Sequence, residues 1–551
     1  MCNKKQSNRF YSREIVDFIV KCGIKHICIS PGSRNTPLTE SFINHKKIKC
    51  FSIFDERASC FYALGLAKTS SSPVAVLTTS GTAIANLFPA IIEAKLSSIP
   101  LLILTADRPA CLVKTGESQT INQNNLYGEY VNEMINVEFQ KESINSILSK
   151  LSKAISQLYS SNNKSAGPVH INFRIDEPLY DNLGKKLTKH PKYKKPSIKL
   201  SSKIKLGTFK KPLIVCGPLS LSCKTKYISE LSRRINAPII ADILSQMRNN
   251  KNSLCYYEHY IDKVNPDIVI RFGDKPTSKK LNQFLNNHKK NSYLINESLK
   301  ENDDCPNIII QKFEKIKTKI GLKGPEDSLW TNKITNYDRK VSKIISLAIS
   351  SHNTQANLIR QLIPKFNNKD HVFIGNSTLI RVFDQFSGLF KPSLKLLGNH
   401  VTRGIDGLVS TALGMSYINI NKKNFLFIGD LSLFYDANGF HILRNKGINL
   451  TIIVINNKGG QIFSQLPYAK KNITKFKEYW TTPPSTSIKK LSELFKLKYY
   501  KMQTIQLVKD MNKISNYNGV KIIEVSINHL SDMKFLEQVK KKINKDLHLQ
   551  K

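Results

Sequence analysis

Short runs rich in Ile, Val and Leu recur along the chain and alternate with longer segments of helical pattern. Runs of this kind are typical of parallel strands that are buried on both faces. A helical stretch such as residues 55–68 between two of them completes the βαβ alternation of a doubly wound sheet. The sequence therefore predicts an α/β fold. In the first third of the chain, the runs are residues 26–30, 73–79, 100–106 and 168–173.

The alternation occurs in three blocks. A polar, Lys-rich stretch at 183–211 is typical of a linker, and residues around 315–340 form a second connection. Three domains of about 100–200 residues each suit a chain of 551 residues. We predict three doubly wound parallel-sheet domains at 1–182, 212–340 and 341–551, with 183–211 as the linker. The later strand runs are residues 213–217, 238–243, 267–273, 308–311, 371–377, 424–430, 450–457 and 521–527.

The net charge of +43 suggests a nucleic-acid partner, but the distribution of the charge does not. Only 15 of the 84 basic residues are Arg, the Lys residues are spread along the chain, and no nucleic-acid-binding motif is present. Asn and Ile, which share AT-rich codons with Lys, are also abundant. We therefore expect no specific nucleic-acid partner.

The sequence also argues against a membrane or secreted protein. No apolar run approaches the roughly 18 residues that span a membrane, and the basic N-terminus has no apolar signal core. Its ten cysteines form no CxxC pair, so reduced thiols are a better interpretation than a disulfide framework or a zinc site. We expect a cytoplasmic protein.

The third block carries the strongest local motif. Asp430 follows a predicted strand, Asn457 follows the next one, and a Gly-rich turn with Gly459 comes directly after. The carboxyl ends of parallel strands meet at one edge of a sheet, where ligands bind. A carboxylate, an amide oxygen and the Gly459 carbonyl are hard ligands that suit Mg²⁺ and its phosphate partners, and a helix after Asp430 would direct N–H groups at the phosphates. The structural alternative is an ordinary βαβ turn in which Asp430 caps a helix.

Several further motifs resemble, in order and spacing, the 2-succinyl-5-enolpyruvyl-6-hydroxy-3-cyclohexene-1-carboxylate (SEPHCHC) synthases of the menaquinone pathway, which depend on thiamine diphosphate. The resemblance covers essentially the whole chain and is weakest in the central block. It implies pyrimidine-binding, central and diphosphate-binding domains, in that order. The motifs are SPGSRNTPL at 30–38, FDER at 54–57, TTSGTA at 78–83, ANL at 85–87, LTADRP at 104–109, GPVHINFRIDEPLY at 167–180, GNS at 375–377, GIDG at 404–407 and NNKGGQIFSQLP at 456–467.

The resemblance implies a reaction and its cofactors. Members of this family decarboxylate 2-oxoglutarate on thiamine diphosphate and add the resulting succinyl carbanion equivalent to isochorismate. The cofactor ion would be Mg²⁺, with Mn²⁺ as an alternative. Glu56 would be the catalytic acid that protonates N1′ of the aminopyrimidine, because an apolar helix follows it. Its structural alternative is a helix-start Glu stabilised by the helix dipole.

The remaining site residues are assigned by the resemblance. The predicted metal ligands are Asp430, Asn457 and Gly459. The predicted cofactor-binding residues are Glu56, Ser377, Ile405, Asp430, Leu431, Ser432, Asn457, Gly459, Gln461 and Ile462. The predicted substrate-binding residues are Ser33, Arg34, Arg108, Gln119, Lys279, Arg381, Phe463 and Leu466.

The three arginines would bind substrate carboxylates as bidentate guanidinium groups, and a structural ion pair is the alternative for each of them. The chain also departs from the family pattern. Leu431 stands where the third Gly of the Gly-Asp-Gly motif is usual, and residues 116–119 read GESQ where the family has GANQ. His400 occupies the position of a family arginine, and Arg403 lies three residues later; the sequence leaves open which of the two faces the substrate.

The family usually builds each site from two chains, so a homodimer or a dimer of dimers is implied. The sequence leaves two alternatives. One is another thiamine diphosphate carboligase, such as an acetolactate-synthase-like enzyme, but the arginines and the TADRP and GGQIF motifs argue against it. The other is a non-catalytic binding protein, which would be expected to lose one of Glu56, Asp430 and Asn457.

Overall fold

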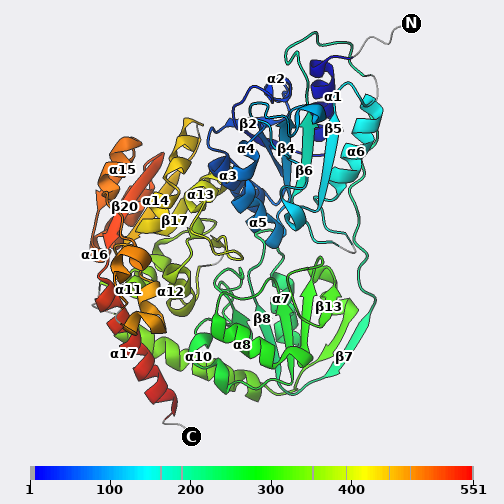
Figure 1. Ribbon diagram of the computed structural model, residues 1–551. Helices are drawn as coiled ribbons and strands as arrows, with labels where there is room; N and C mark the ends of the chain where they lie inside the picture. Colours follow the sequence, from blue (N-terminus) through cyan, green and yellow to red (C-terminus); the bar gives the residue numbers. More distant parts are fainter. Residues whose placement is uncertain are drawn as a thin grey trace. The chain divides into compact units, whose positions relative to one another are not determined.

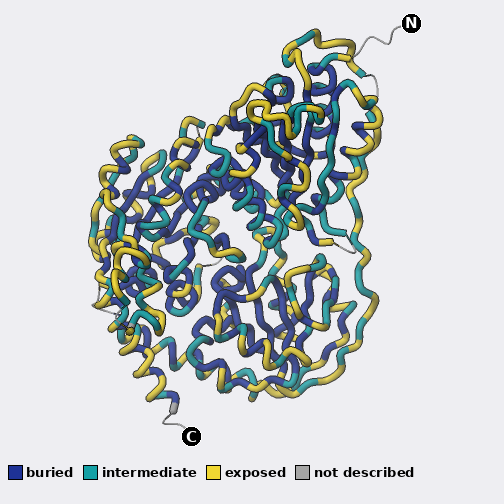
Figure 2. The backbone as a smooth tube through the Cα atoms, viewed as in Figure 1, coloured by how far each residue is buried: buried dark blue, intermediate teal, exposed yellow. Residues whose placement is uncertain are grey.

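The computed structural model describes residues 6–161, 164–187, 190–349, 353–391, 394–445, 447–471 and 473–548. The strands in these residues form three six-stranded parallel sheets and one two-stranded parallel ladder. The predicted α/β fold with three doubly wound parallel sheets is therefore confirmed (Figure 1). By its internal contacts the chain divides into two compact units, which are 1–198 with 406–418 and 436–448, and the rest of the chain. Figure 2 shows that the sheet strands are largely buried within each unit.

The first unit contains a sheet of order β2-β1-β3-β4-β6-β5. The apolar runs form β1, β3, β4 and β6, as expected for strands covered on both faces. The strands are β1 (His26–Ile29), β2 (Lys49–Ser52), β3 (Val74–Thr78), β4 (Leu101–Asp107), β5 (Glu133–Glu138) and β6 (Val169–Arg174). The helices are α1 (Asn8–Lys21), α2 (Thr36–Ile43), α3 (Glu56–Ser70), α4 (Ala83–Asn86), α5 (Phe88–Leu96) and α6 (Ile144–Ser156).

Two segments from the last third of the sequence pack into this same unit, namely α13 (Leu408–Ile418) and the 3₁₀ segment η8 (Ala437–Arg444). Helices α3 and α13 are in close backbone contact. A Cβ atom on Gly65 would lie 2.0 Å from the carbonyl oxygen of Thr411, and one on Gly414 would lie 2.3 Å from that of Tyr62. Glycine is thus required on both helices, because any larger residue would push them apart.

The second unit contains the central sheet, of order β10-β9-β8-β11-β12-β13. Its strands are β8 (Pro212–Cys216), β9 (Ile239–Ala241), β10 (Ser253–Leu254), β11 (Ile268–Phe272), β12 (Ser292–Asn296) and β13 (Asn307–Ile310). Its helices are α7 (Lys226–Arg234), α8 (Lys279–Asn287), α9 (Ile316–Lys319) and α10 (Leu329–Ala348).

The C-terminal sheet, in the same unit, has the order β16-β15-β17-β18-β20-β19. Its strands are β15 (His371–Ile374), β16 (Lys395–Leu397), β17 (Asn424–Gly429), β18 (Leu450–Asn456), β19 (Lys498–Lys501) and β20 (Val520–Ser526). Its helices are α11 (Gln355–Leu362), α12 (Thr378–Phe386), α14 (Asp430–Tyr435), α15 (Ile488–Leu494), α16 (Thr504–Ser515) and α17 (His529–His548).

The structure adds detail to three local expectations. The linker at 183–211 is not wholly irregular, because β7 (Ile204–Thr208) pairs with β14 (Ile320–Lys323). The connection around 315–340 contains β14 and the first half of α10. No long helix follows Asp430, since α14 has six residues and η8 is a separate 3₁₀ segment. In the described part of the chain, nine cysteines are free thiols, and no helix is long and apolar enough to span a membrane.

Candidate active site

Within the first unit, the loops after β1, β3 and β4 meet at the carboxyl edge of the sheet. A Cβ atom on Gly32 would lie 2.2 Å from the Cβ of Thr79. The loop after β1 can therefore pack against the end of β3 only if residue 32 is glycine. Ser33 and Arg34 follow Gly32, and Arg108 follows β4. The edge thus brings together residues that are far apart in sequence.

Glu56 is the first residue of α3 and is half-buried in this unit. The preceding Asp55 caps the helix by accepting a hydrogen bond from the Ala58 N–H at 3.0 Å. A second donor, the side-chain amide of Asn438, reaches the other Asp55 oxygen at 2.9 Å. The Glu56 carboxylate accepts a 3.4 Å hydrogen bond from the Asn86 amide. The start of α3, and with it Glu56, is therefore held from two sides.

Both arginines at this edge have only weak protein partners for their charge. Arg34 is buried, with 7% of its surface exposed, and donates to the carbonyl of Ile175 at 3.2 Å. Its guanidinium group also lies 3.4 Å from the exposed carboxylate of Glu177. Arg108 lies 3.7 Å from Glu117, and its buried Nε has no hydrogen-bond partner in the described chain. Such arginines retain bonding capacity for a ligand carboxylate.

Within the second unit, Asp430 organises the carboxyl edge of the C-terminal sheet. One of its oxygens accepts the Gly459 N–H at 2.9 Å, and the other accepts the Leu431 N–H at 2.9 Å. The residue is 2% exposed, and this burial raises the pKa of its carboxyl group, which the two N–H donors offset in part. The loop after β18 is therefore tied to the end of β17 through a single carboxylate, as the sequence predicted for neighbouring strands.

In the loop after β18, close packing and a hydrogen bond restrain the backbone at Gly459 and Gly460, while the side chain of Asn457 makes no hydrogen bond to the described residues. Gly459 has a φ of +104°, and a Cβ there would lie 2.0 Å from the Thr481 carbonyl oxygen, so only glycine fits. Gly460 donates to the same carbonyl at 2.7 Å. No residue in the described chain hydrogen-bonds the side chain of Asn457. A groove of about 700 Å³ lies beside Asn457 and Gln461, so the unpaired amide has open space next to it.

This donor set fits a divalent cation and a diphosphate. A buried carboxylate, an unpaired amide oxygen and the backbone carbonyls of a glycine turn offer hard oxygen ligands of the kind Mg²⁺ takes. Neighbouring Leu431 and Ser432 lie in α14 and are half-buried. The first turn of α14 is partly engaged within the protein, because Asp430 accepts the N–H of Leu431.

The loop after β15 completes this edge. Ser377 has a φ of +70°, and the side chain of Asn376 donates to the Gly404 carbonyl at 2.7 Å. That bond joins the two separate loops of the second unit on which the predicted residues Ser377 and Ile405 lie. Arg381 follows on α12.

The structure separates the roles of His400 and Arg403. His400 Nε2 lies 3.2 Å from Asp274, which also pairs with Lys300 at 2.8 Å. Burial acts to raise the pKa of Asp274, but Lys300 and His400 outweigh it and hold that pKa below its ordinary value. Arg403 is exposed and, among the described residues, donates only to backbone, to the His400 carbonyl at 3.1 Å and to the Pro276 carbonyl at 3.5 Å. His400 is thus engaged with a carboxylate of the central domain, whereas the charge of Arg403 is not.

Arg381 is electrostatically close to Arg403. Arg381 is exposed at the start of α12; partial desolvation and then the like charge of Arg403 lower its pKa, while Glu258 acts in the opposite direction. Within the described residues, Arg381 makes no hydrogen bond or ion pair. Two guanidinium groups in this state favour an anion between or beside them.

The remaining predicted residues lie at exposed positions. Lys279 is the first residue of α8 and is exposed. Phe463 and Leu466 lie in the segment after Ile462 and are 36% and 38% exposed. Gln119 is exposed with a φ of +51°. Large apolar side chains left exposed in this way are consistent with a binding surface.

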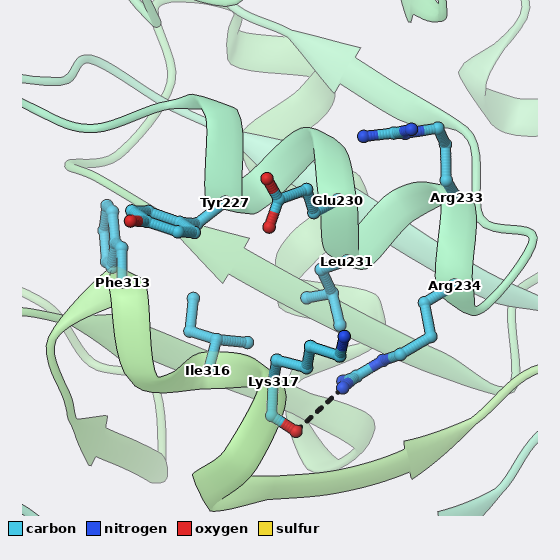
Figure 3. Close-up of a pocket in the computed structure, with 8 residues that line it drawn as sticks. All are labelled: Tyr227, Glu230, Leu231, Arg233, Arg234, Phe313, Ile316 and Lys317. Carbon is cyan, nitrogen blue, oxygen red and sulfur yellow. Dashed lines mark hydrogen bonds between the residues drawn. The ribbon is translucent and has the colours of Figure 1, made fainter.

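A second hollow, of about 340 Å³, lies in the central domain and contains none of the predicted residues. Figure 3 shows Tyr227 and Leu231 of α7 facing Phe313 and Ile316 across it. Arg234 is engaged there, since it donates to the carbonyl of Lys317 at 2.9 Å. The hollow is therefore lined by residues of the central domain alone.

Sequence reasoning missed three residues that hold the first-unit edge, Asn438, Asp436 and Gln123. Asp436 is fully buried and accepts from the N–H of Ser410 at 2.7 Å and from its hydroxyl at 3.1 Å. Burial raises the pKa of Asp436 to about 7. Gln123 and Asp436 lie outside regular elements and Asn438 lies in the short segment η8, so no sequence periodicity marks them as buried or bonded.

Comparison with known proteins agrees with this geometry. Three family models match consecutive parts of the chain, namely the thiamine pyrophosphate enzyme N-terminal TPP binding domain (11–126), the middle domain of thiamine pyrophosphate enzymes (183–374) and the C-terminal TPP binding domain (386–525). The fold and site thus define a thiamine diphosphate enzyme, as predicted. The boundaries 182, 211 and 340 stay predictions.

Curated relatives narrow the class. A 2-succinyl-5-enolpyruvyl-6-hydroxy-3-cyclohexene-1-carboxylate synthase of Listeria innocua is 32% identical, and one of Staphylococcus aureus is 33% identical, each with 96% of both chains covered. One of Oceanobacillus iheyensis is 32% identical with 94% of both chains covered. The chain belongs to the SEPHCHC synthase family. The predicted resemblance is confirmed, and the acetolactate-synthase-like alternative is not supported.

Proposed function

We propose that this protein releases CO₂ from 2-oxoglutarate and joins the remaining four-carbon unit to isochorismate, giving SEPHCHC. The observation that carries the proposal is the state of Arg34, Arg108 and Arg381, three guanidinium groups with weak or no protein carboxylate partners in the described chain. Both substrates are polycarboxylates, so such groups match them in charge and geometry. Family membership supports the same reaction.

Thiamine diphosphate, when bound, supplies the thiazolium carbon that stabilises negative charge as CO₂ leaves. Glu56 would hold and return the proton at N1′ of its aminopyrimidine ring. The caps from Asp55 and Asn438 fix the helix start from which Glu56 acts. Asp430, Asn457 and the Gly459 carbonyl would hold Mg²⁺, with Ser377, Ile405, Leu431, Ser432, Gln461 and Ile462 placed around the cofactor.

The substrate side of the proposal uses the other predicted residues. Arg34, Arg108 and Arg381 would bind carboxylates, with Ser33, Gln119 and Lys279 as further polar contacts. Phe463 and Leu466 would cover the substrate and exclude water. Arg403 would add the charge that the family arginine provides at position 400, because His400 is engaged with Asp274. The cytoplasmic location stays part of the proposal.

A direct assay tests the reaction. Purified protein with thiamine diphosphate, Mg²⁺, 2-oxoglutarate and isochorismate should yield CO₂ and SEPHCHC in equal amounts. Release of CO₂ without the adduct, or equal turnover of pyruvate to acetolactate, would contradict the assignment.

The proposal includes two chains for each site, one contributing Glu56 and the other Asp430. Mixing Glu56→Gln with Asp430→Ala protomers should then restore part of the activity, because some mixed dimers carry one intact site. Sedimentation and exchange of labelled subunits serve as the control. No recovery despite demonstrated exchange would instead favour sites built within one chain.

A further inference from the structure

A buried polar network lies under the carboxyl edge of the first-unit sheet, and Gln123 is its centre. This side chain is 1% exposed. Its amide nitrogen donates to the side-chain oxygen of Asn172 at 2.7 Å and to the Ala106 carbonyl at 3.2 Å, and its oxygen accepts the Gly81 N–H at 3.0 Å. Both amide hydrogens and the oxygen are thus in use, in a place that water does not reach.

Asn172 extends the network to the next strands. Its amide nitrogen donates to Asp107 at 2.8 Å and to Asn136 at 2.9 Å, while its oxygen also accepts from the Thr105 hydroxyl at 2.7 Å. That hydroxyl in turn lies 2.8 Å from His170 Nε2. Burial lowers the pKa of His170 to about 3, so the ring is neutral and can donate from Nε2. The two amide side chains are fully hydrogen-bonded, and buried networks in this state are rigid.

The two ends of the network are at predicted substrate-binding residues. Asp107, whose one oxygen is held by Asn172, accepts the backbone N–H of Arg108 with the other at 2.8 Å. Gly81, held by Gln123, has a φ of +81°, and its Cβ position lies 3.4 Å from the Gln119 carbonyl oxygen. The network therefore connects the backbone of Arg108 with the loop that carries Gln119.

We propose that Gln123 is a positioning residue that sets the placement of Arg108 relative to Gln119 and thereby substrate-carboxylate recognition. The inference rests on the proposed function. Substrate binding and cofactor binding should respond differently to a change at Gln123. Glu56 follows β2 and its hydrogen bond goes to Asn86, so the proposed cofactor contact lies outside the network. Loss of Gln123 should therefore impair substrate binding far more than thiamine diphosphate binding.

Only an amide has the required donors and acceptor. In Gln123→Glu, an ionised carboxylate would face the oxygens of Asn172 and Ala106 without a proton to donate. In Gln123→Leu, the Gly81 N–H and the Asn172 oxygen would each lose a partner. Leaving buried groups unpaired costs enough to change affinity by about 10- to 100-fold. We expect KM for at least one substrate to rise by that factor, with kcat changed less.

The pH profile gives a readout that a general loss of stability would not produce. Once protonated, the carboxyl group introduced by Gln123→Glu regains one O–H donor, so the KM defect of this variant should shrink as pH falls. The control is Gln140→Glu, the same substitution at a half-buried amide of the same unit that lies outside the network and bonds Asn8 at 3.4 Å. It should leave both KM values and their pH profiles unchanged.

The test measures KM for both substrates between about pH 6 and 8, the range in which the enzyme should stay folded. It also measures thiamine diphosphate affinity by calorimetry and hydrogen exchange of the Gly81 amide. Faster exchange at Gly81 in Gln123→Leu, with wild-type cofactor affinity and raised KM, supports the inference. Wild-type KM values in a folded Gln123→Glu enzyme would overturn it.

Two further outcomes keep the result clear. If Gln123→Leu fails to fold, Gln123→Glu and its pH profile still decide the question. An inactive wild-type enzyme would instead refute the proposed function, so the failure of the inference and the failure of the proposed function are distinct.

Discussion

The N-terminal and C-terminal sheets have the same topology and hold their site residues by different means. Numbered within each domain, both have the strand order 2-1-3-4-6-5. At the N-terminal edge, the side-chain amides of Gln123 and Asn172 bond to each other, and Asn172 holds Asp107, which accepts the backbone N–H of Arg108. At the C-terminal edge, the carboxylate of Asp430 fixes a glycine turn through backbone N–H groups. The same topology thus carries different polar residues after its strands, and these residues, not the topology, underlie the different roles proposed for the two edges.

The central sheet sharpens this comparison. Its order is 3-2-1-4-5-6, that of a dinucleotide-binding fold, yet none of the predicted cofactor residues lies on it. It contributes instead to the cluster around Asp274 and His400. Fold alone does not indicate which edge carries the chemistry.

Replacing Glu56 is the most severe test of the N-terminal edge. Glu56→Gln keeps the shape and the contact with Asn86 but removes the group that exchanges a proton. We expect kcat to fall by about 10²–10⁴-fold, with thiamine diphosphate affinity affected less. Steady-state kinetics and calorimetry measure the two separately. Near-normal turnover would remove the proposed proton role from this edge.

Replacing Arg108 by Lys tests recognition at the same edge. The charge is kept, but the planar guanidinium is lost. Affinity for the substrate whose carboxylate it binds should fall by about 10–150-fold, the range for a hydrogen bond to a charged group. Single-turnover decarboxylation without isochorismate shows which substrate is affected. Wild-type behaviour in both half-reactions would make Arg108 structural.

Replacing Asp430 tests the C-terminal edge. Asp430→Ala removes a proposed metal ligand and the acceptor of the Gly459 N–H. We expect the apparent affinities for both Mg²⁺ and thiamine diphosphate to weaken, by at least the roughly 10–100-fold that loss of a ligand's supporting partner costs. Calorimetry with each component varied in turn is the measurement. Unchanged cofactor affinity would show that Asp430 does not hold the metal and the cofactor at the C-terminal edge as proposed.

The smallest expected effect concerns Glu117, which stands 3.7 Å from Arg108 where the family pattern has Ala. An exposed ion pair of this length contributes at most about 1 kcal/mol, and it competes with a substrate carboxylate. Glu117→Ala should lower KM by up to about five-fold. Glu117→Gln, which removes the charge but keeps the size, should behave similarly. A raised KM in both variants would show that Glu117 supports Arg108 instead of competing for it.

The sequence by itself was enough to predict the three parallel sheets and to predict that the loops of Asp430 and Asn457 are neighbours. Strands covered on both faces must be apolar along their length, so β4 and β18 are visible as continuous runs. Asp430 and Asn457 follow consecutive strands that are neighbours in the sheet, so local spacing predicted that their loops lie side by side. These features depend on residues close in sequence or on a regular period.

Tertiary structure alone decided how the predicted residues are supported. Gln123 and Asn172 are 49 residues apart, and Asp55 and Asn438 are 383 apart. Isolated polar residues carry no periodic pattern, so their burial and partners arise only when distant segments pack together. The same holds for the contact of α3 with α13 and for the pairing of β7 with β14 inside the predicted linker. Side-chain hydrogen bonding between distant segments depends on three-dimensional proximity, which local sequence patterns do not encode.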